Sequence, residues 1–320
     1  MPLDIAHLPE TSRLLTAAPP DMLYHYTGGQ ALQSITGNAE LWAGLPEQMN
    51  DAEELRRALR WLKLLASERQ FDARAERDKG ESYIFDKWAA DQSKHALEDG
   101  RWLDDVPKSY IISLSREGDS LSQWRAYCSE NNGYCIGLPT AVIVPAIEAA
   151  GALLAPCIYD EEAVESIVRE IYDFHVDRWL ANAPERTYAT TTEGLERDSN
   201  ARSESVISAW KDMITEMRLI GHFIKNPSFE AENEWRILFF DRETTCDDLK
   251  FSTGKNGVRA FLPFKFAEHV SRPMSDKPRP SLRIGPNSNA TGAKFPALRL
   301  LEQLVGAGNA DVFTTGSSFR

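Results

Sequence analysis

Strand patterns gather at the two ends of this chain, and helical patterns fill its middle. Alternating apolar and polar side chains predict strands in residues 22–28, 109–114, 134–138, 234–240, 249–252, 258–262, 282–284 and 310–314. Apolar residues at three- and four-residue spacing predict the longer helices, in residues 51–70, 83–97, 162–180 and 203–224. This order of elements favours the α+β fold class.

We expect one domain over residues 1–320, because a chain of this length can bury a large core without dividing. Its mixed or antiparallel sheet would be built from residues 20–140 and 225–320, with residues 150–224 as a helical insertion. Two loops and a final helix are also predicted, in residues 182–198, 272–280 and 296–305.

Residues 109–138 form the most informative local unit, a strand followed by a short helix and a second strand. Asp119 or Ser120 is placed to cap the helix, whose spacing brings Trp124 and Tyr127 to one face. Gly133, which follows two asparagines, ends the helix because glycine tolerates the left-handed conformation. The unit therefore presents an acid and two aromatic side chains close together.

Composition limits the partners and the location of the protein. The net charge of −12 argues against nonspecific duplex binding. Residues 249–300 differ, with ten Lys or Arg against two acids, so this segment either meets the phosphates of a nucleotide or RNA or neutralises the acidic remainder. The four cysteines show no CxxC spacing, so neither a disulfide scaffold nor a zinc site is expected. No run predicts a secretion signal or membrane span, and we expect a cytoplasmic protein.

Several runs in fixed order resemble a known family. They are MLYHYTG (22–28), MNDAEE (49–54), SQWRAY (122–127), KNPSFEAENEWR (225–236) and LRIGP (282–286). Together they resemble the DUF2971 family of uncharacterised bacterial proteins over nearly the whole chain. The sequence departs from the family pattern at Ala52, Gln123, Asn131 and Phe229, where the family has proline, methionine, histidine and tryptophan.

The order histidine, aromatic residue, glutamate also resembles the arrangement in ADP-ribosyltransferases. That resemblance implies that His25 holds the ribose hydroxyls of NAD, to which Thr27 adds a hydroxyl. It implies that Tyr127 or Trp124 stacks a flat ring of NAD. Glu234 would stabilise the oxocarbenium-like charge as the N-glycosidic bond breaks. The spacing of Glu232 and Glu234 is similar to the Glu-x-Glu element of arginine-directed members.

Each of these residues also has a purely structural interpretation. Trp124 fits a role in packing the short helix against the sheet. Arg125 and Arg236 could hold a diphosphate or pair with nearby acids. Glu232 and Glu234 share one face with Glu230 if all three lie in a strand, so something must relieve their repulsion, or Glu230 lies in a loop.

Three functions therefore compete. The first is an enzyme that uses NAD as substrate and transfers ADP-ribose to protein, nucleic acid or water, without a metal. The second is a non-catalytic nucleotide- or protein-binding module, such as a sensor in stress or phage defence. The third is a metal-dependent nuclease built on the carboxylates. The first two require His25, an aromatic ring and Glu234 to line one cavity, whereas the third requires clustered acids with a histidine.

Overall fold

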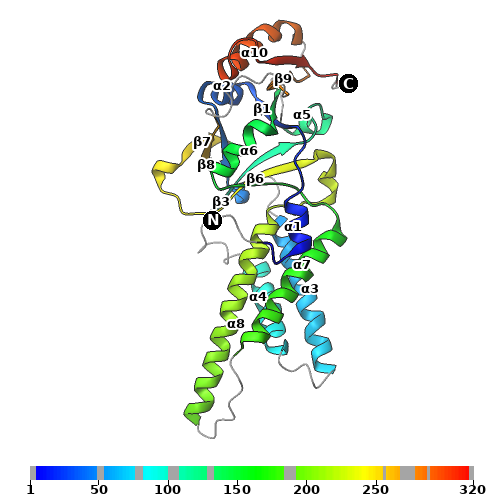
Figure 1. Cartoon of the computed structure of the whole chain (residues 1–320), viewed down its shortest axis with the longest axis vertical. Coiled ribbons are helices and arrows are strands. Elements are labelled where there is room, and N and C mark those ends of the chain that lie inside the picture. Colours follow the sequence, from blue (N-terminus) through cyan, green and yellow to red (C-terminus); the bar gives the residue numbers. More distant parts are fainter. Residues whose placement is uncertain are drawn as a thin grey trace.

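The computed structural model describes residues 5–48, 54–75, 82–99, 108–127, 133–183, 192–254, 257–266, 278–286 and 289–316. It confirms the α+β class: a mostly antiparallel sheet forms one half, and a long helical bundle extends away from it (Figure 1). No helix in the described ranges has a long enough apolar stretch to span a membrane.

The first half of the chain contains, in order, α1 (Pro9–Leu15), β1 (Met22–Gly28), α2 (Gly29–Asn38), β2 (Glu40–Gly44), η1 (Pro46–Gln48), α3 (Glu54–Ala75), α4 (Ser82–Asp99), β3 (Lys108–Ser115), α5 (Leu121–Tyr127), β4 (Gly133–Pro139), α6 (Thr140–Ala149) and β5 (Leu153–Pro156). The second half contains α7 (Glu161–Asn182), α8 (Thr192–Gly221), η5 (Pro227–Glu232), β6 (Glu234–Arg242), η6 (Cys246–Asp248), β7 (Lys250–Gly254), β8 (Gly257–Lys265), β9 (Ser281–Ile284), α10 (Ala290–Val305) and β10 (Asp311–Thr314).

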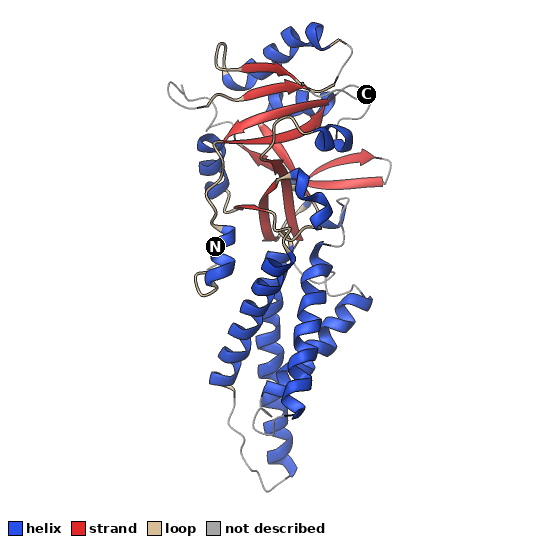
Figure 2. Cartoon of the chain, turned by 90° about the vertical axis from the view of Figure 1, so that its right-hand side faces the viewer, coloured by secondary structure: helices blue, strands red, loops and turns tan. Residues whose placement is uncertain are grey.

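The strands of the described residues form one sheet in the order β10-β9-β4-β1-β3-β2-β8-β7, with β6 paired to β3 and β5 paired to β6. Among the described strands, β9 and β10 alone pair in parallel. Figure 2 shows the strands together in one half of the molecule and the long helices in the other. Along one edge, β3 pairs with β6 over almost its whole length. On its other edge β3 meets β1 only at Tyr24–Ser115 and β2 only at Gly44–Ile111. Strands β1 and β2 therefore share one edge of β3 without pairing with each other.

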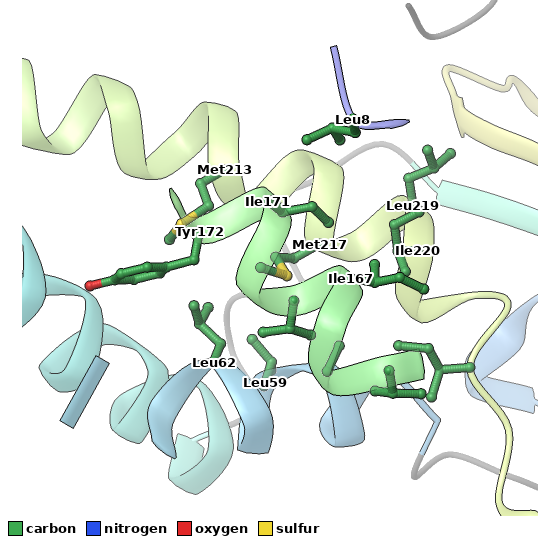
Figure 3. Close-up of a cluster of buried hydrophobic side chains, with 14 of the residues drawn as sticks. Leu8, Leu59, Leu62, Ile167, Ile171, Tyr172, Met213, Met217, Leu219 and Ile220 are labelled. Atoms are coloured by element: carbon green, nitrogen blue, oxygen red, sulfur yellow. The ribbon is translucent and has the colours of Figure 1, made fainter. Parts of the chain in front are cut away.

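The helical half is built from two pairs of helices, each of which connects two strands of the sheet. Helices α3 and α4 leave after β2 and return at β3, and α7 and α8 leave after β5 and return at β6. Their apolar faces meet in one cluster, which includes Leu59 of α3, Ile171 of α7 and Met217 of α8 (Figure 3). The expected division placed α3 and α4 with the sheet and β5 with the insertion. The structure instead packs α3 and α4 against α7 and α8, and pairs β5 with β6.

A second core lies under the sheet. Leu23, Ile136 and Ile237 from β1, β4 and β6 pack with apolar side chains of α2, α6 and α10, including Leu32 and Leu301. Successive side chains of a strand point to opposite faces, so these residues bring one face of the sheet into this core. The sheet thus has its own core, separate from that of the helices.

Two boundaries differ from the sequence prediction. Helix α8 begins at Thr192, inside the segment predicted as a loop, because a polar segment joins a helix more easily than it starts one. Helix α10 begins at Ala290, although the prediction began at Pro296. Proline favours the first turn of a helix, and inside one it removes a backbone donor and crowds the carbonyl four residues earlier. Helix α10 nevertheless continues through Pro296.

Candidate functional site

A small cavity of about 80 Å³ lies where β1, β3, α5, η5 and β6 meet. Its lining is Tyr24, His25, Tyr26, Ser113, Leu114, Ser115, Gln123, Tyr127, Glu232 and Glu234. His25, Tyr127 and Glu234 thus line one cavity, which is the convergence that the first two functional hypotheses required. Strand register brings it about, because Ser115 of β3 pairs with Tyr24 of β1 on one side and with Glu234 of β6 on the other.

His25 is fixed as a neutral ring. Its Nδ1 lies 3.1 Å from the backbone oxygen of Ser113, and a carbonyl only accepts, so Nδ1 carries the proton and donates it. Burial lowers the pKa of His25 below its ordinary value, and the bond to Ser113 only partly offsets this. With Nδ1 protonated and the ring neutral, Nε2 is an acceptor. The ring can therefore accept a hydrogen bond from a ligand hydroxyl.

Four charged side chains form a compact cluster at the cavity wall: Lys225, Glu232, Glu234 and Arg236. The Lys225 Nζ lies 2.6 Å from Glu232 and also bonds Glu234. Arg236 Nε donates to Glu234 at 2.8 Å, and its NH1 donates to the backbone oxygen of His222 at 2.5 Å. All but Glu232 are at least nine-tenths buried. The cluster is therefore a charge-balanced network rather than an exposed acidic patch.

The network keeps Glu234 ionised. Burial works against its charge, but Arg236 and Lys225 outweigh burial and lower the pKa of Glu234 to about 2. Burial likewise opposes the charge of Lys225, yet Glu234 and Glu232 raise the pKa of Lys225 above its ordinary value. A carboxylate with fixed negative charge therefore faces the cavity near neutral pH.

Local backbone structure sets the positions of Glu232 and Glu234. Asn226 caps η5 by accepting from the Ser228 N–H at 3.0 Å, and Asn233 adopts a left-handed conformation with φ of 43°. That turn separates Glu232, which ends η5, from Glu234, which starts β6, and lets both reach Lys225. Glu230 lies exposed within η5, so the three glutamates do not share a strand. Lys225 relieves the repulsion between the other two.

Hydroxyl groups hold the surrounding loops. Ser115 Oγ donates to the Glu232 backbone oxygen at 2.7 Å and accepts from the Glu117 N–H at 3.0 Å. Tyr159 Oη accepts from the Glu234 N–H at 2.9 Å. These bonds tie the ends of β3 and β6 and the loop after β5 to one another, and so fix the position of the Glu234 backbone.

The aromatic candidates have different positions. Tyr127 lines the cavity and is 42% exposed. Partial burial of its hydroxyl, with Glu232 and Glu234 nearby, raises the pKa of Tyr127 to about 12, so it remains a donor. Trp124 is fully buried: its ring meets Tyr26 edge-on at 4.7 Å, and its Nε1 donates to Asp119 at 2.8 Å. The expectation that Trp124 could stack a ligand is corrected, because its ring is enclosed by packing.

The arginine candidates also differ from the expectation of a diphosphate clamp. The Arg236 guanidinium is 1% exposed and is engaged by Glu234 and the His222 carbonyl. The guanidinium is therefore part of a structural ion pair and does not make the predicted contact with a ligand phosphate. Arg125 is exposed on α5 and does not line the cavity.

A larger hollow of about 700 Å³ adjoins the small cavity, and His25 and Tyr127 line both. The rest of its lining comes from Thr27, α2, β2, β7 and β8. Its volume falls within the range of small-molecule sites. Thr27 thus lies on the side of His25 away from Glu234, within reach of the same ligand.

The metal hypothesis receives no ligand set from the described part of the chain. No group of three or more His, Cys, Asp or Glu side chains within it is arranged to hold a metal ion. Cys135 and Cys157 are buried free thiols and Cys246 is exposed. Cys128, Asn131 and the acids at 51–53 lie outside the described residues.

Lys225 and Tyr159 are the residues that sequence reasoning missed. Lys225 begins the run KNPSFEAENEWR, so its position beside the two glutamates carried a signal: a lysine shortly before alternating acids is the expected counter-charge. Tyr159 carried none, because its contact with Glu234 joins segments far apart in sequence.

The fold and site define an α+β protein in which a small cavity adjoins a buried, charge-balanced cluster. Residues 123–237 match the family model described as "Protein of unknown function (DUF2971)", which confirms the predicted resemblance for this segment. The match runs from α5 into β6 and includes Tyr127, the cluster of four charges and the intervening helices. The runs at 22–28, 49–54 and 282–286 lie outside it. No curated protein and no solved structure matches the chain.

Proposed function

We propose that this protein is an NAD-utilising enzyme of the ADP-ribosyltransferase type, which cleaves the N-glycosidic bond between nicotinamide and ribose. The observation that supports this proposal most is the shared lining of one cavity by His25, Tyr127 and Glu234. Its connection with a hollow of about 700 Å³ gives the remainder of a dinucleotide somewhere to lie.

Each side chain has a defined role in the proposed reaction. His25 Nε2 accepts a hydrogen bond from a ribose hydroxyl, and the Tyr127 ring packs on the nicotinamide. The bond between ribose C1′ and the nicotinamide nitrogen breaks, and its electron pair leaves with neutral nicotinamide. Positive charge then develops on the ribosyl group and is stabilised by the carboxylate of Glu234. An acceptor nucleophile forms the new bond to C1′ and releases its proton.

The acceptor is proposed to approach from the basic segment. Residue pairing sets Lys250 opposite Phe261 and Arg259 opposite Ser252, so both cations share the face of the strands that lines the hollow. A phosphate-bearing nucleic acid or an acidic protein would meet them there. We propose a cytoplasmic location, with which four cysteines lacking a pairing pattern agree.

One observation favours a second candidate, a nucleotide-binding module without turnover. Glu232 and Glu234 are both bonded to Lys225, and Glu234 also to Arg236. Their negative charge is already compensated, which weakens its effect on a developing cation. The same geometry still binds ribose and an aromatic ring.

Purified protein incubated with NAD separates the two candidates. Nicotinamide release, measured by liquid chromatography, is compared with NAD affinity from titration calorimetry. The enzyme predicts release that Glu234→Gln reduces about 10²–10³-fold with affinity nearly kept. Exposed Glu230 supplies the matched control, and Glu230→Gln should change neither quantity.

Binding without release, lost in Tyr127→Ala, supports the module instead. Tyr127 is partly exposed, so this variant tests the site without removing a buried side chain. If the folded wild-type protein neither binds NAD nor releases nicotinamide from it, both candidates are refuted.

A further inference from the structure

The larger hollow has one wall that the proposed reaction does not use. Strand β2 alternates so that Leu41 and Ala43 enter the sheet core, while Glu40 and Trp42 face the hollow. Phe261 of β8 pairs with Gly44 and lies on the same face. A Cβ at Gly44 would lie 3.7 Å from the Phe261 ring, so this ring rests directly over the glycine.

Two aromatic rings make this wall. The Trp42 and Phe261 centroids are 5.4 Å apart with 39° between the ring planes. Trp42 is 36% exposed, while its neighbours Leu41 and Ala43 on the other face of β2 are buried. An aromatic side chain open to a hollow offers a platform on which a planar base stacks.

Glu40 adds a buried acceptor to the platform. It is 6% exposed, lines the hollow, and accepts from Trp42 Nε1 at 2.9 Å through Oε1. Among the described residues this is the one hydrogen bond of the Glu40 side chain, and its Oε2 receives none. Oε2 is not among the fully enclosed side-chain atoms, so it is open to the hollow and can accept from a donor group of a ligand. An ionised carboxylate accepts and does not donate, which selects an N–H group over a carbonyl.

We infer that β2 carries a recognition site for a purine that bears an exocyclic amino group. The ring stacks on Trp42 beside Phe261, and the amino group donates to Glu40. The identity of this purine as the adenine of NAD rests on the proposed function. His25 and Tyr127 line both cavities, so a dinucleotide with its adenine at Trp42 places its other end toward Glu234.

Paired ligands that differ in one group test the inference. Titration calorimetry compares AMP with IMP, and NAD with nicotinamide hypoxanthine dinucleotide, in which a carbonyl replaces the adenine amino group. The wild-type protein should bind the amino member of each pair about ten times more tightly or better, because the other member turns a carbonyl oxygen toward Glu40 in place of the amino group. Its only new donor, N1–H, lies at the neighbouring ring position and not where the amino group was. Glu40→Gln should bring the ratio close to one, since an amide both donates and accepts.

Two further variants separate stacking from hydrogen bonding. Trp42→Ala should weaken both members of a pair by a similar factor of about ten and keep the ratio. Glu47→Gln, an exposed acid on η1 outside the hollow, should leave affinities and ratio unchanged. Circular dichroism confirms that each variant is folded.

The outcomes distinguish this inference from the proposed reaction. A preference for AMP over IMP that depends on Glu40, without nicotinamide release from NAD, supports the base site and refutes the reaction. Nicotinamide release with equal affinity for the amino and carbonyl members supports the reaction and overturns the base site. A ratio unchanged by Glu40→Gln, or binding of none of the four ligands, also overturns it.

Discussion

Removing Lys225 tests whether the charge cluster stabilises the fold as the geometry implies. The side chains of Lys225, Glu232 and Glu234 are 7%, 13% and 3% exposed, so water does little to screen them. Lys225→Met keeps the apolar stem but removes the ammonium, which also lies 5.3 Å from the centroid of the Phe229 ring. Glu232 then loses its counter-charge and Glu234 retains only Arg236.

The expected loss in the free energy of unfolding is about 3–5 kcal/mol at pH 7, because an uncompensated buried charge remains. Arg13→Met is the control, since Arg13 and Glu10 form a 2.8 Å pair with side chains 69% and 52% exposed. Such a pair contributes less than about 1 kcal/mol.

Urea unfolding, followed by circular dichroism and fluorescence, measures both losses. Lys225→Met combined with Glu232→Gln should recover part of the stability, because the second change removes the charge left without a partner. A loss in Lys225→Met no larger than that in Arg13→Met would refute the reasoning.

Three more predictions concern acid stability and packing. The pKa of Glu234 is about 2 when folded and 4.5 ordinarily, so its contribution of about 3 kcal/mol is complete above pH 4.5 and is lost as pH falls toward 2; the acid dependence of the urea midpoint should flatten in Glu234→Gln. Gly285→Ala should lower the free energy of unfolding, measured by thermal unfolding, by about 1–3 kcal/mol, because its Cβ would lie 2.9 Å from the Trp124 ring. In helix α2, a Cβ at Gly37 meets nothing within 4 Å, so Gly37→Ala should raise the same free energy by about 0.5–1 kcal/mol. Trp124→Ala should cost about 3–5 kcal/mol in urea unfolding; a change in NAD affinity without loss of stability would instead place that ring at the ligand.

The sequence predicted the strands that form the site, because alternating apolar and polar residues mark a strand with one buried face. Alternation in residues 22–28 places His25 and Thr27 on one face of the strand and Tyr24 and Tyr26 on the other. It also indicated that three alternating glutamates needed an explanation. The position of a residue along an element is a local property, and local properties are what a pattern records.

The same patterns do not show which segments, far apart in the sequence, pack against each other. An amphipathic helix shows that one face is buried but not against which element, so α3 and α4 were expected near the sheet although they pack on α7 and α8. Trp124 and Tyr127 lie one turn apart on α5, yet one ring is enclosed and the other lines the cavity. That difference depends on Tyr26 and Asp119, whose contacts with Trp124 are tertiary.

The pairing of β3 with β6 also governs what a growing polypeptide exposes during translation. Strand β3 ends at Ser115, but the strand that covers its full length begins at Glu234, after both α7 and α8 have been made. Until β6 leaves the ribosome, one edge of β3 has open backbone donors and acceptors, which attract other chains. A product truncated within α7 or α8 is therefore a nucleus for aggregation rather than a smaller folded protein.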